Sequence, residues 1–259
     1  MKGIGMDNWI DPIAFHIGSR PVFWYGIFVA AGFLLGVLHY GRLDKLDGRR
    51  KGFGSDFAFL VILFGILGGR IAYVIANWPE YAAAPLEVFR IDRGGLIFYG
   101  GFILASIAVI VMAQLKKEPV GQLVDYGITA VPLGHALGRV GCFFNGCCYG
   151  RPSELPWSVL TAGEHRHPVQ VYEAAFNLGL FFLLTWFYGR RKRDGSVLAL
   201  YMMYYGGWRF VGEFFRGDAR RAIIAGGLDV AQGISIGLIL IGCALWFFAP
   251  RRVQQSHAA

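Results

Sequence analysis

The sequence predicts an all-α, polytopic membrane protein with about seven transmembrane helices. Hydrophobic residues make up 55% of the 259 residues and charged residues only 16%, with a mean hydropathy of +0.47. A soluble domain carries about 25% charged residues, so this chain has too few polar groups to cover a surface in water. The apolar residues also gather in runs of membrane-spanning length. We therefore expect one integral-membrane domain over residues 1–259.

Seven segments of the chain are apolar over about the 20 residues that a helix needs to cross the hydrocarbon core. The fourth segment is the weakest, because Asp125, Pro132 and His135 interrupt it. Neither an internal repeat nor a low-complexity linker divides the sequence. The seven segments are about 21–40, 56–76, 96–114, 122–138, 171–188, 196–215 and 231–249.

Lysine and arginine gather in every second connection between these segments. Positively charged connections stay on the cytoplasmic side of a membrane, so we predict an external N-terminus and a cytoplasmic C-terminus. The basic connections are 42–52, 116–117, 190–193 and 251–252. The connections expected outside are a long one at about 139–170 and shorter ones at 77–95 and 216–230.

The formal net charge of +8 fits a lipid bilayer as the main partner. In a membrane protein such an excess sits in cytoplasmic loops or meets anionic lipid head groups. The basic runs are short and lie between spans. We therefore expect no nucleic-acid partner.

Several ionisable side chains fall at membrane depth, where each costs a few kcal/mol unless it is paired or wetted. Arg209 and Glu213 are four residues apart and Arg216 follows three residues later, so the three share one helix face. Arginine holds phosphate with a planar, bidentate fork. An arginine-lined cavity near the outer leaflet would suit a phospholipid head group. The residues concerned are Arg70, Asp125, Arg139, Glu173, Arg209, Glu213 and Arg216.

The same charged residues also have structural interpretations. Arg209 and Glu213 fit an internal ion pair. Arg70 fits a pair with Asp125 or with a loop carbonyl. Glycines at 68–69 and 100–101 favour close helix packing, although they would also let backbone N–H groups face a ligand.

Two histidines and two tyrosines are further candidates. His167 precedes a proline at the entrance of a span and is either a general base or a residue at the start of a helix. His135, one turn before Arg139, is expected to pack or to hydrogen-bond a neighbour. Tyr25 and Tyr99 lie at span ends, where interfacial aromatic belts also place tyrosines.

Three of the four cysteines fall in the stretch GRVGCFFNGCCYG at 138–150. On an oxidising external face, Cys142 could bond with Cys147 or Cys148. Zinc would need a fourth ligand, and the spacing is not that of a usual zinc knuckle. We rank packing or a disulfide first, a nucleophile second and a metal site third. Cys243 lies alone in the last span.

Seven blocks of sequence, in this order, are similar to those of one family of membrane enzymes. Each block is modestly specific, whereas the ordered set is highly specific. The chain therefore resembles the prolipoprotein diacylglyceryl transferases nearly end to end. The blocks are WIDPIAFHIGSRPVFWYGIFVAAGF, GGRIAYVIANW, GGLIFYGGFI, GRVGCFFNGCCYGRPSELPW, HPVQVYEAAFN, WRFVGEFFRGD and AQGISIG.

The resemblance implies a transfer reaction in the inner membrane of a bacterium. The diacylglyceryl group of phosphatidylglycerol moves to the thiol of a lipobox cysteine in a prolipoprotein signal peptide, and glycerol 1-phosphate leaves. The thiol must become thiolate-like, and the charge of the leaving phosphate must be stabilised. This scheme requires neither a metal nor an organic cofactor. The alternatives are a paralogue with another phospholipid or acceptor, and a non-enzymatic transporter or binder of anionic lipid.

The resemblance also implies roles for the residues at matching positions. Arg139 and Arg209 are expected to contact the phosphate and head group, with Tyr99 and Glu213 completing the catalytic set. The substrate-binding set is expected to be Tyr25, Arg70, Asn145, Glu173 and Arg216.

The chain departs from the family pattern at three positions. The family usually has histidine where this chain has Tyr99, and often glutamate and asparagine where it has Cys147 and Cys142. A tyrosine, with an ordinary pKa of about 10, is a poor base unless an arginine stabilises the phenolate. Either the base lies elsewhere, or the histidine's role was hydrogen bonding, or the chain is a paralogue with altered chemistry.

Overall fold

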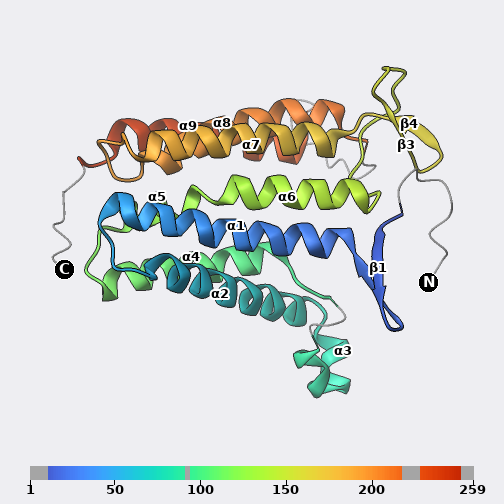
Figure 1. Cartoon of the computed structure of the whole chain (residues 1–259), viewed down its shortest axis with the longest axis horizontal. Helices are drawn as coiled ribbons and strands as arrows, with labels where there is room; N and C mark the ends of the chain where they lie inside the picture. The colour runs from blue at the N-terminus through green and yellow to red at the C-terminus, as the bar shows by residue number, and fades with distance from the viewer. Residues whose placement is uncertain (1–10, 91–93, 218–227, 252–259) are drawn as a thin grey trace. The chain divides into compact units, whose positions relative to one another are not determined.

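The protein is seen in a computed structural model that describes residues 11–90, 94–217 and 228–251 (Figure 1). The described chain is mostly helical, as predicted, with two short antiparallel hairpins and two 3-10 turns. The longer helices are α1 Trp24–Asp47, α2 Phe53–Ala76, α4 Phe98–Leu115, α5 Val120–Ile128, α6 Val131–Phe144, α7 Val169–Tyr188, α8 Ser196–Gly212 and α9 Val230–Phe248. The shorter elements are β1 Ile13–Ile17, β2 Arg20–Phe23, α3 Trp78–Ala83, η1 Pro85–Phe89, β3 Val159–Thr161, β4 Glu164–Arg166 and η3 Glu213–Phe215.

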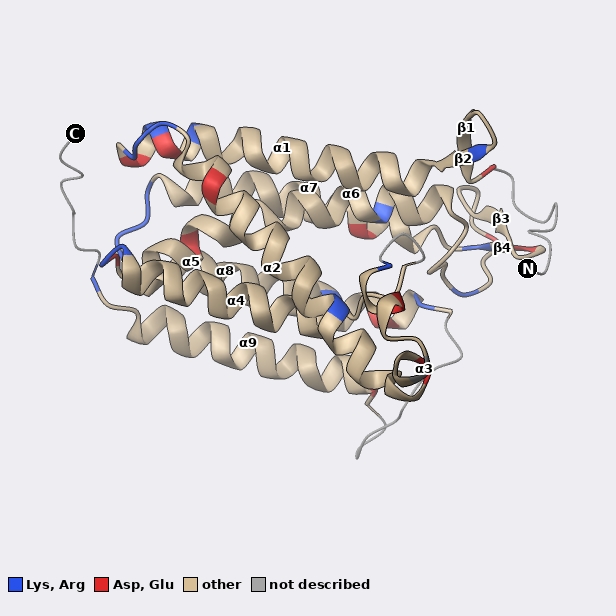
Figure 2. Cartoon of the chain, turned by 90° about the horizontal axis from the view of Figure 1, so that it is seen from below, with Lys and Arg blue, Asp and Glu red and all other residues tan. Residues whose placement is uncertain are grey.

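Five of the described helices are long and apolar enough to cross a membrane: α1, α2, α4, α7 and α9. Large apolar side chains on them are exposed, among them Leu34, Ile71 and Phe182. Figure 2 shows charged residues gathered mainly at helix ends, with few along the helices. The surface of these helices is therefore suited to lipid rather than to water.

The fourth predicted span, at 122–138, is not one helix. Its residues belong to α5 and α6, and α6 runs on to Phe144. Pro132 stands in the first turn of α6, where a missing N–H group does no harm. Farther along a helix the same proline would break it, and this explains why a new helix begins here. Arg139 therefore lies within a helix rather than at its end.

The sixth predicted span, at 196–215, is also shorter than expected. Helix α8 ends at Gly212 after 17 residues, and the chain tightens into the 3-10 turn η3. The start of α8 is held by Asp125. Its carboxylate accepts hydrogen bonds from the backbone N–H groups of Gly195, Val197 and Leu198 at 2.9–3.0 Å. These N–H groups have no partner within the helix, so Asp125 has a structural role.

The chain divides into two compact units. The described residues of Met1–Leu38 and Asp125–Val253 form the first unit, and those of His39–Val124 form the second unit. Within the first unit, α6 packs on α7, α7 on α8, and α8 on α9 (Figure 1). Small residues allow the last contact, because a Cβ at Gly206 would lie only 3.0 Å from the carbonyl oxygen of Ser235.

The second unit is built on the close pairing of α2 and α4. A Cβ at Gly101 would lie 2.5 Å from the carbonyl oxygen of Gly65, and Gly68 and Gly100 meet as closely. The glycines predicted to favour helix packing at 68 and 100 thus do so. This is the small-residue contact by which membrane helices approach each other.

Candidate functional site

The centre of the site begins on α6 and α7, in the first unit. His135 and Arg139 are one turn apart on α6, and both face Glu173 of α7. Arg139 Nε lies 2.9 Å from one carboxylate oxygen of Glu173, and His135 Nε2 lies 3.3 Å from the other. Glu173 is only 3% exposed. A carboxylate so buried is tolerated only when charged or hydrogen-bonding partners surround it.

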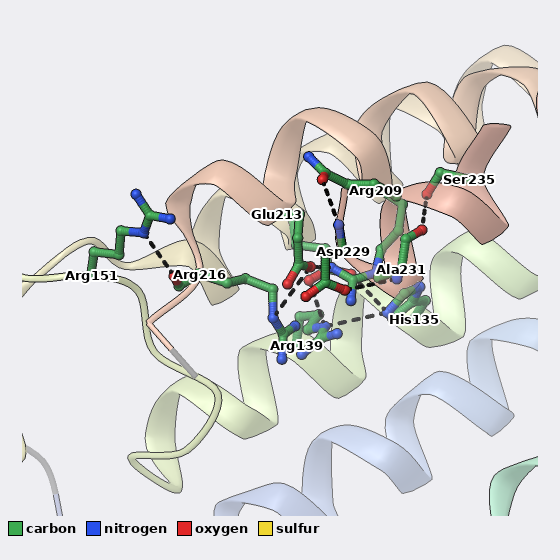
Figure 3. A network of polar contacts seen from close by, with 11 residues as sticks. His135, Arg139, Arg151, Arg209, Glu213, Arg216, Asp229, Ala231 and Ser235 are labelled. Carbon is green, nitrogen blue, oxygen red and sulfur yellow. Dashed lines mark hydrogen bonds and ion pairs between the residues drawn. The ribbon is translucent and has the colours of Figure 1, made fainter. Parts of the chain in front are cut away.

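A second ion-pair group lies at the end of α8. Arg209 Nη1 donates to Glu213 Oε2 at 2.7 Å, and Arg216 Nε lies 3.8 Å from the same oxygen. The chain stays wound through η3, so the four- and three-residue spacings hold all three side chains on one side. The prediction that these residues share a face is confirmed, and Figure 3 shows them together.

The two groups form one cluster. Glu173 lies within electrostatic range of both Arg139 and Arg209. Figure 3 shows Arg139 of α6 lying close to Arg216 and Glu213 from the end of α8. We call Arg139, Glu173, Arg209, Glu213 and Arg216 the arginine cluster.

The arginine cluster has one more positive than negative charge. Within these five residues alone, three guanidinium groups face two carboxylates when His135 is neutral, and Figure 3 also draws Asp229 close to them. Among the described residues, no acceptor is bound to the two terminal nitrogens of Arg139, or to Nε and Nη2 of Arg209. The cluster thus has both the charge and the donors to hold an anion. Phosphate esters are the anions that the guanidinium fork fits best.

The stretch 138–150 is tied to the chain around the cluster. Gly150 N donates to His167 O at 3.0 Å, and Arg151 N donates to Phe215 O at 2.9 Å. A Cβ at Gly150 would lie 2.6 Å from the Cβ of His167, so only glycine fits. His167 thus contributes its backbone here, while its ring lies against the ring of Phe215. The turn is fixed between the end of η3 and the start of α7.

Tyr25 and Asn145 also lie near the cluster. A Cβ at Gly141 would lie 3.1 Å from the Cα of Tyr25, so the start of α1 lies directly on α6. Tyr25 is within electrostatic range of Arg139. Asn145 follows the last residue of α6, and its side chain interacts with the thiol of Cys147. The structure therefore brings seven of the nine predicted site residues into the first unit: Tyr25, Arg139, Asn145, Glu173, Arg209, Glu213 and Arg216.

Among the described residues, Arg70 in α2 of the second unit binds a loop rather than a charged partner. Its five N–H groups all donate to backbone carbonyl oxygens, those of Glu87, Val88, Arg90, Gly94 and Gly95, at 2.7–3.2 Å. A guanidinium has five such donors, so none remains for a substrate in this conformation. The structural interpretation with loop carbonyls is confirmed, whereas the substrate-binding role stays a prediction.

Tyr99, the other predicted site residue of the second unit, is the second residue of α4. Its side chain is 69% exposed, and its ring lies 5.8 Å from that of Phe98. Its hydroxyl has no hydrogen-bond partner among the described residues. Its catalytic role stays a prediction.

Two residues near the cluster were not among the predicted site residues. His135 was expected to pack or to hydrogen-bond a neighbour, and its Nε2 accepts a hydrogen bond from Arg139 Nε at 3.3 Å and lies 3.3 Å from the buried Glu173. Tyr205 lies within electrostatic range of Glu173, Arg139, Arg209 and Arg216. Tyr205 is four residues before Arg209 in α8, and this helical spacing was the signal that could have found it.

The cysteines of the stretch 138–150 are free thiols in the structure, as is Cys243. The Sγ atoms of Cys142, Cys147 and Cys148 lie within 4.8 Å of one another. Arg139 is within electrostatic range of Cys142 and Cys148. The three thiols are therefore neighbours of the arginine cluster.

Comparisons with known proteins agree on one family. The model of the family "prolipoprotein diacylglyceryl transferase" matches residues 12–248. Three relatives are named phosphatidylglycerol–prolipoprotein diacylglyceryl transferase. The relative from Cupriavidus pinatubonensis is 36% identical over 95% of this chain and 94% of its own length. The relative from Pseudoalteromonas translucida is 37% identical over 96% of each chain, and that from Bordetella bronchiseptica is 36% identical over 93% and 96%.

Proposed function

Because the chain belongs to the prolipoprotein diacylglyceryl transferase family, we propose that it transfers the diacylglyceryl group of phosphatidylglycerol to a prolipoprotein. The acceptor is the thiol of the lipobox cysteine, the product is a thioether, and glycerol 1-phosphate is released. Beyond family membership, the observation that carries the proposal is the arginine cluster. It offers more guanidinium than carboxylate groups to a lipid phosphate, with terminal donors of Arg139 and Arg209 that have no partner among the described residues.

The charge of the cluster suits both the bound substrate and the leaving phosphate. Phosphatidylglycerol is a phosphodiester with one negative charge, which balances the net charge of the cluster. When the bond from the glyceryl carbon to oxygen breaks, the leaving phosphate gains a second negative charge. Donors that already face this oxygen stabilise the charge as it develops. Arg139 and Arg209 have this role in the proposal, and Glu213 and Glu173 hold them in place.

The other members of the site have supporting roles in the proposal. Arg216 adds the third positive charge. Tyr25 and Asn145 line the end of α6 beside the head group. Arg70 and Tyr99 lie in the second unit, where Arg70 supports its loop.

The proposed location is the inner membrane of a bacterium, with one integral domain over residues 1–259. Seven crossings require that α5 and α6 together, and α8, each add one to the five longest apolar helices. The N-terminus would then be external and the C-terminus cytoplasmic. The basic connections at 42–52 and 190–193 support this orientation.

The proposal is tested with purified protein, phosphatidylglycerol and a lipobox peptide. We expect a thioether-linked lipopeptide and an equal amount of glycerol 1-phosphate, and no product from the same peptide with serine in place of cysteine. An absence of both products, while a relative turns over in parallel, would overturn the proposal. Lipid movement across vesicles without either product would favour a transporter instead.

The alternative of a paralogue is favoured by Cys142, Cys147 and Tyr99, which replace residue types usual in the family. It predicts turnover with another head group or acceptor. The same assay with phosphatidylglycerol, phosphatidylethanolamine and phosphatidic acid separates the two, because our proposal expects a clear preference for phosphatidylglycerol.

A further inference from the structure

The three neighbouring thiols of Cys142, Cys147 and Cys148 have no part in the reaction as proposed so far. Cys142 lies in the last turn of α6, and the other two follow in the next turn of chain. Their Sγ atoms, within 4.8 Å of one another, form a compact set of three soft ligands.

The backbone holds these thiols in place. Gly146 and Cys148 both have left-handed conformations, with φ of 64° and 61°. A residue other than glycine, such as Cys148, rarely adopts this backbone conformation unless its surroundings require it. Cys147 N donates to Cys142 O at 3.2 Å, and the buried Gln170 donates to Cys147 O at 2.7 Å. The turn therefore presents its sulfur atoms from a fixed frame.

Three such sulfur atoms match the ligand set of a zinc ion with one open position. Catalytic zinc sites have three protein ligands and a fourth position for water or substrate. With Zn–S bonds of about 2.3 Å, a tetrahedral site needs sulfur atoms about 3.8 Å apart, and the three Sγ atoms lie within 4.8 Å of one another. Three thiolates and one Zn²⁺ leave a single negative charge. Arg139 and Arg216 lie within electrostatic range of Cys148.

We infer that Cys142, Cys147 and Cys148 bind a zinc ion whose open position takes the acceptor thiol of the prolipoprotein as a thiolate. The inference rests on the proposed function and adds to it the group that activates the thiol. The transfer scheme alone needs no metal, but it needs a means to deprotonate this thiol. The clustered thiols supply that means in a chain that has Tyr99 where the family usually has histidine.

The acceptor thiol binds zinc and releases its proton to water. The thiolate attacks the glyceryl carbon, a carbon–sulfur bond forms, and the bond from that carbon to the phosphate oxygen breaks. The electron pair of the broken bond leaves on glycerol 1-phosphate, beside Arg139. Nothing is oxidised or reduced.

The first test measures metal content. Protein purified with reductant, stripped and then incubated with zinc is expected to hold about one zinc ion per chain. Cys142→Ser and Cys148→Ser should lose it. Cys243→Ser is the matched control, because Cys243 lies in α9, beside Met203, and should keep the zinc. A wild type that holds no zinc, or cluster variants that hold as much, would overturn the inference. So would a disulfide among the three thiols in cells quenched with acid and alkylated.

The second test asks whether the open position takes the acceptor thiol, without turnover. The cobalt-loaded protein should gain sulfur-to-cobalt absorption when the lipobox peptide is added, and gain none with the serine peptide. Equal spectra with both peptides would overturn the inference.

The third test separates this inference from the proposed function. Removal of zinc should lower thioether formation at least about 100-fold, and zinc should restore it. Full activity of the metal-free protein would overturn the zinc site and leave the transferase standing. A cobalt response to the lipobox peptide without thioether product under any condition would overturn the transferase and leave the metal site standing.

Discussion

Arginines in the two units of this molecule are bound in opposite ways. Arg70 in the second unit donates all five N–H groups to the carbonyl oxygens of one loop. Arg139 and Arg209 in the first unit are each held by one carboxylate and keep terminal donors without a partner among the described residues. An arginine at membrane depth is thus not by itself a sign of a ligand. What distinguishes Arg139 and Arg209 as candidate ligand-binding residues is that they keep donors without a partner among the described residues.

The largest effect is expected from Arg139→Ala. This change removes phosphate donors and leaves the buried Glu173 with His135 as its neighbour instead of the Arg139 guanidinium. We expect kcat/KM for phosphatidylglycerol to fall about 100- to 1,000-fold, as measured by release of glycerol 1-phosphate. Membrane insertion should be normal. Turnover near the wild-type rate would remove Arg139 from the site.

A smaller effect is expected from Glu213→Gln. Glu213 holds Arg209 at 2.7 Å and lies 3.8 Å from Arg216, so a neutral side chain loosens both arginines. We expect kcat/KM to fall about 10-fold, or about 1.4 kcal/mol. Glu80→Gln, in α3 of the second unit, is a matched control that should change nothing. Equal loss in both variants would show that the charge change acts generally.

A change in stability rather than in lipid binding is expected from Arg70→Gln. Loop carbonyls that lose their donors cost about 1–3 kcal/mol each if they stay buried. Amide exchange over residues 85–90 and 94–95 should become faster and the thermal midpoint should fall, while KM for phosphatidylglycerol stays within about threefold, about 0.7 kcal/mol. A large rise in KM with unchanged exchange would make Arg70 a substrate-binding residue after all.

The smallest effect is expected from Tyr99→Phe, because the exposed Tyr99 hydroxyl has no partner among the described residues. Expressed in a bacterium depleted of its own transferase, this variant should support growth as the wild type does. Failure to do so, at equal protein level, would restore Tyr99 to the catalytic set.

Much of the helical fold is predictable from the sequence, because a run of apolar residues is itself the reason that a helix crosses a bilayer. The five longest apolar runs correspond to α1, α2, α4, α7 and α9. The break between α5 and α6 was not predicted, because a hydropathy pattern does not register the backbone effect of Pro132. The two hairpins were missed because they are short, and the second strand of the first hairpin lies at the start of the first apolar run.

The site was predictable where its contacts are local. Spacing along one helix was enough to group Arg209, Glu213 and Arg216. The pairing of Arg139 with Glu173 joins two helices, so spacing could not reveal it. The sequence placed Arg70 with the other arginines, and only its three-dimensional partners separate it from them. For the three cysteines, a metal site was ranked third, after packing or a disulfide and a nucleophile, because their spacing is unusual. The left-handed residues of the turn nevertheless bring their sulfur atoms together.

The central claim, that the arginine cluster holds the phosphate, is tested most directly by binding of glycerol 1-phosphate. The measurement is titration calorimetry on wild type, Arg139→Gln and Arg70→Gln in the same detergent. We predict equal affinity for wild type and Arg70→Gln, and an affinity at least about tenfold weaker for Arg139→Gln, about 1.4 kcal/mol. Loss of binding in Arg70→Gln with binding retained in Arg139→Gln would contradict the claim.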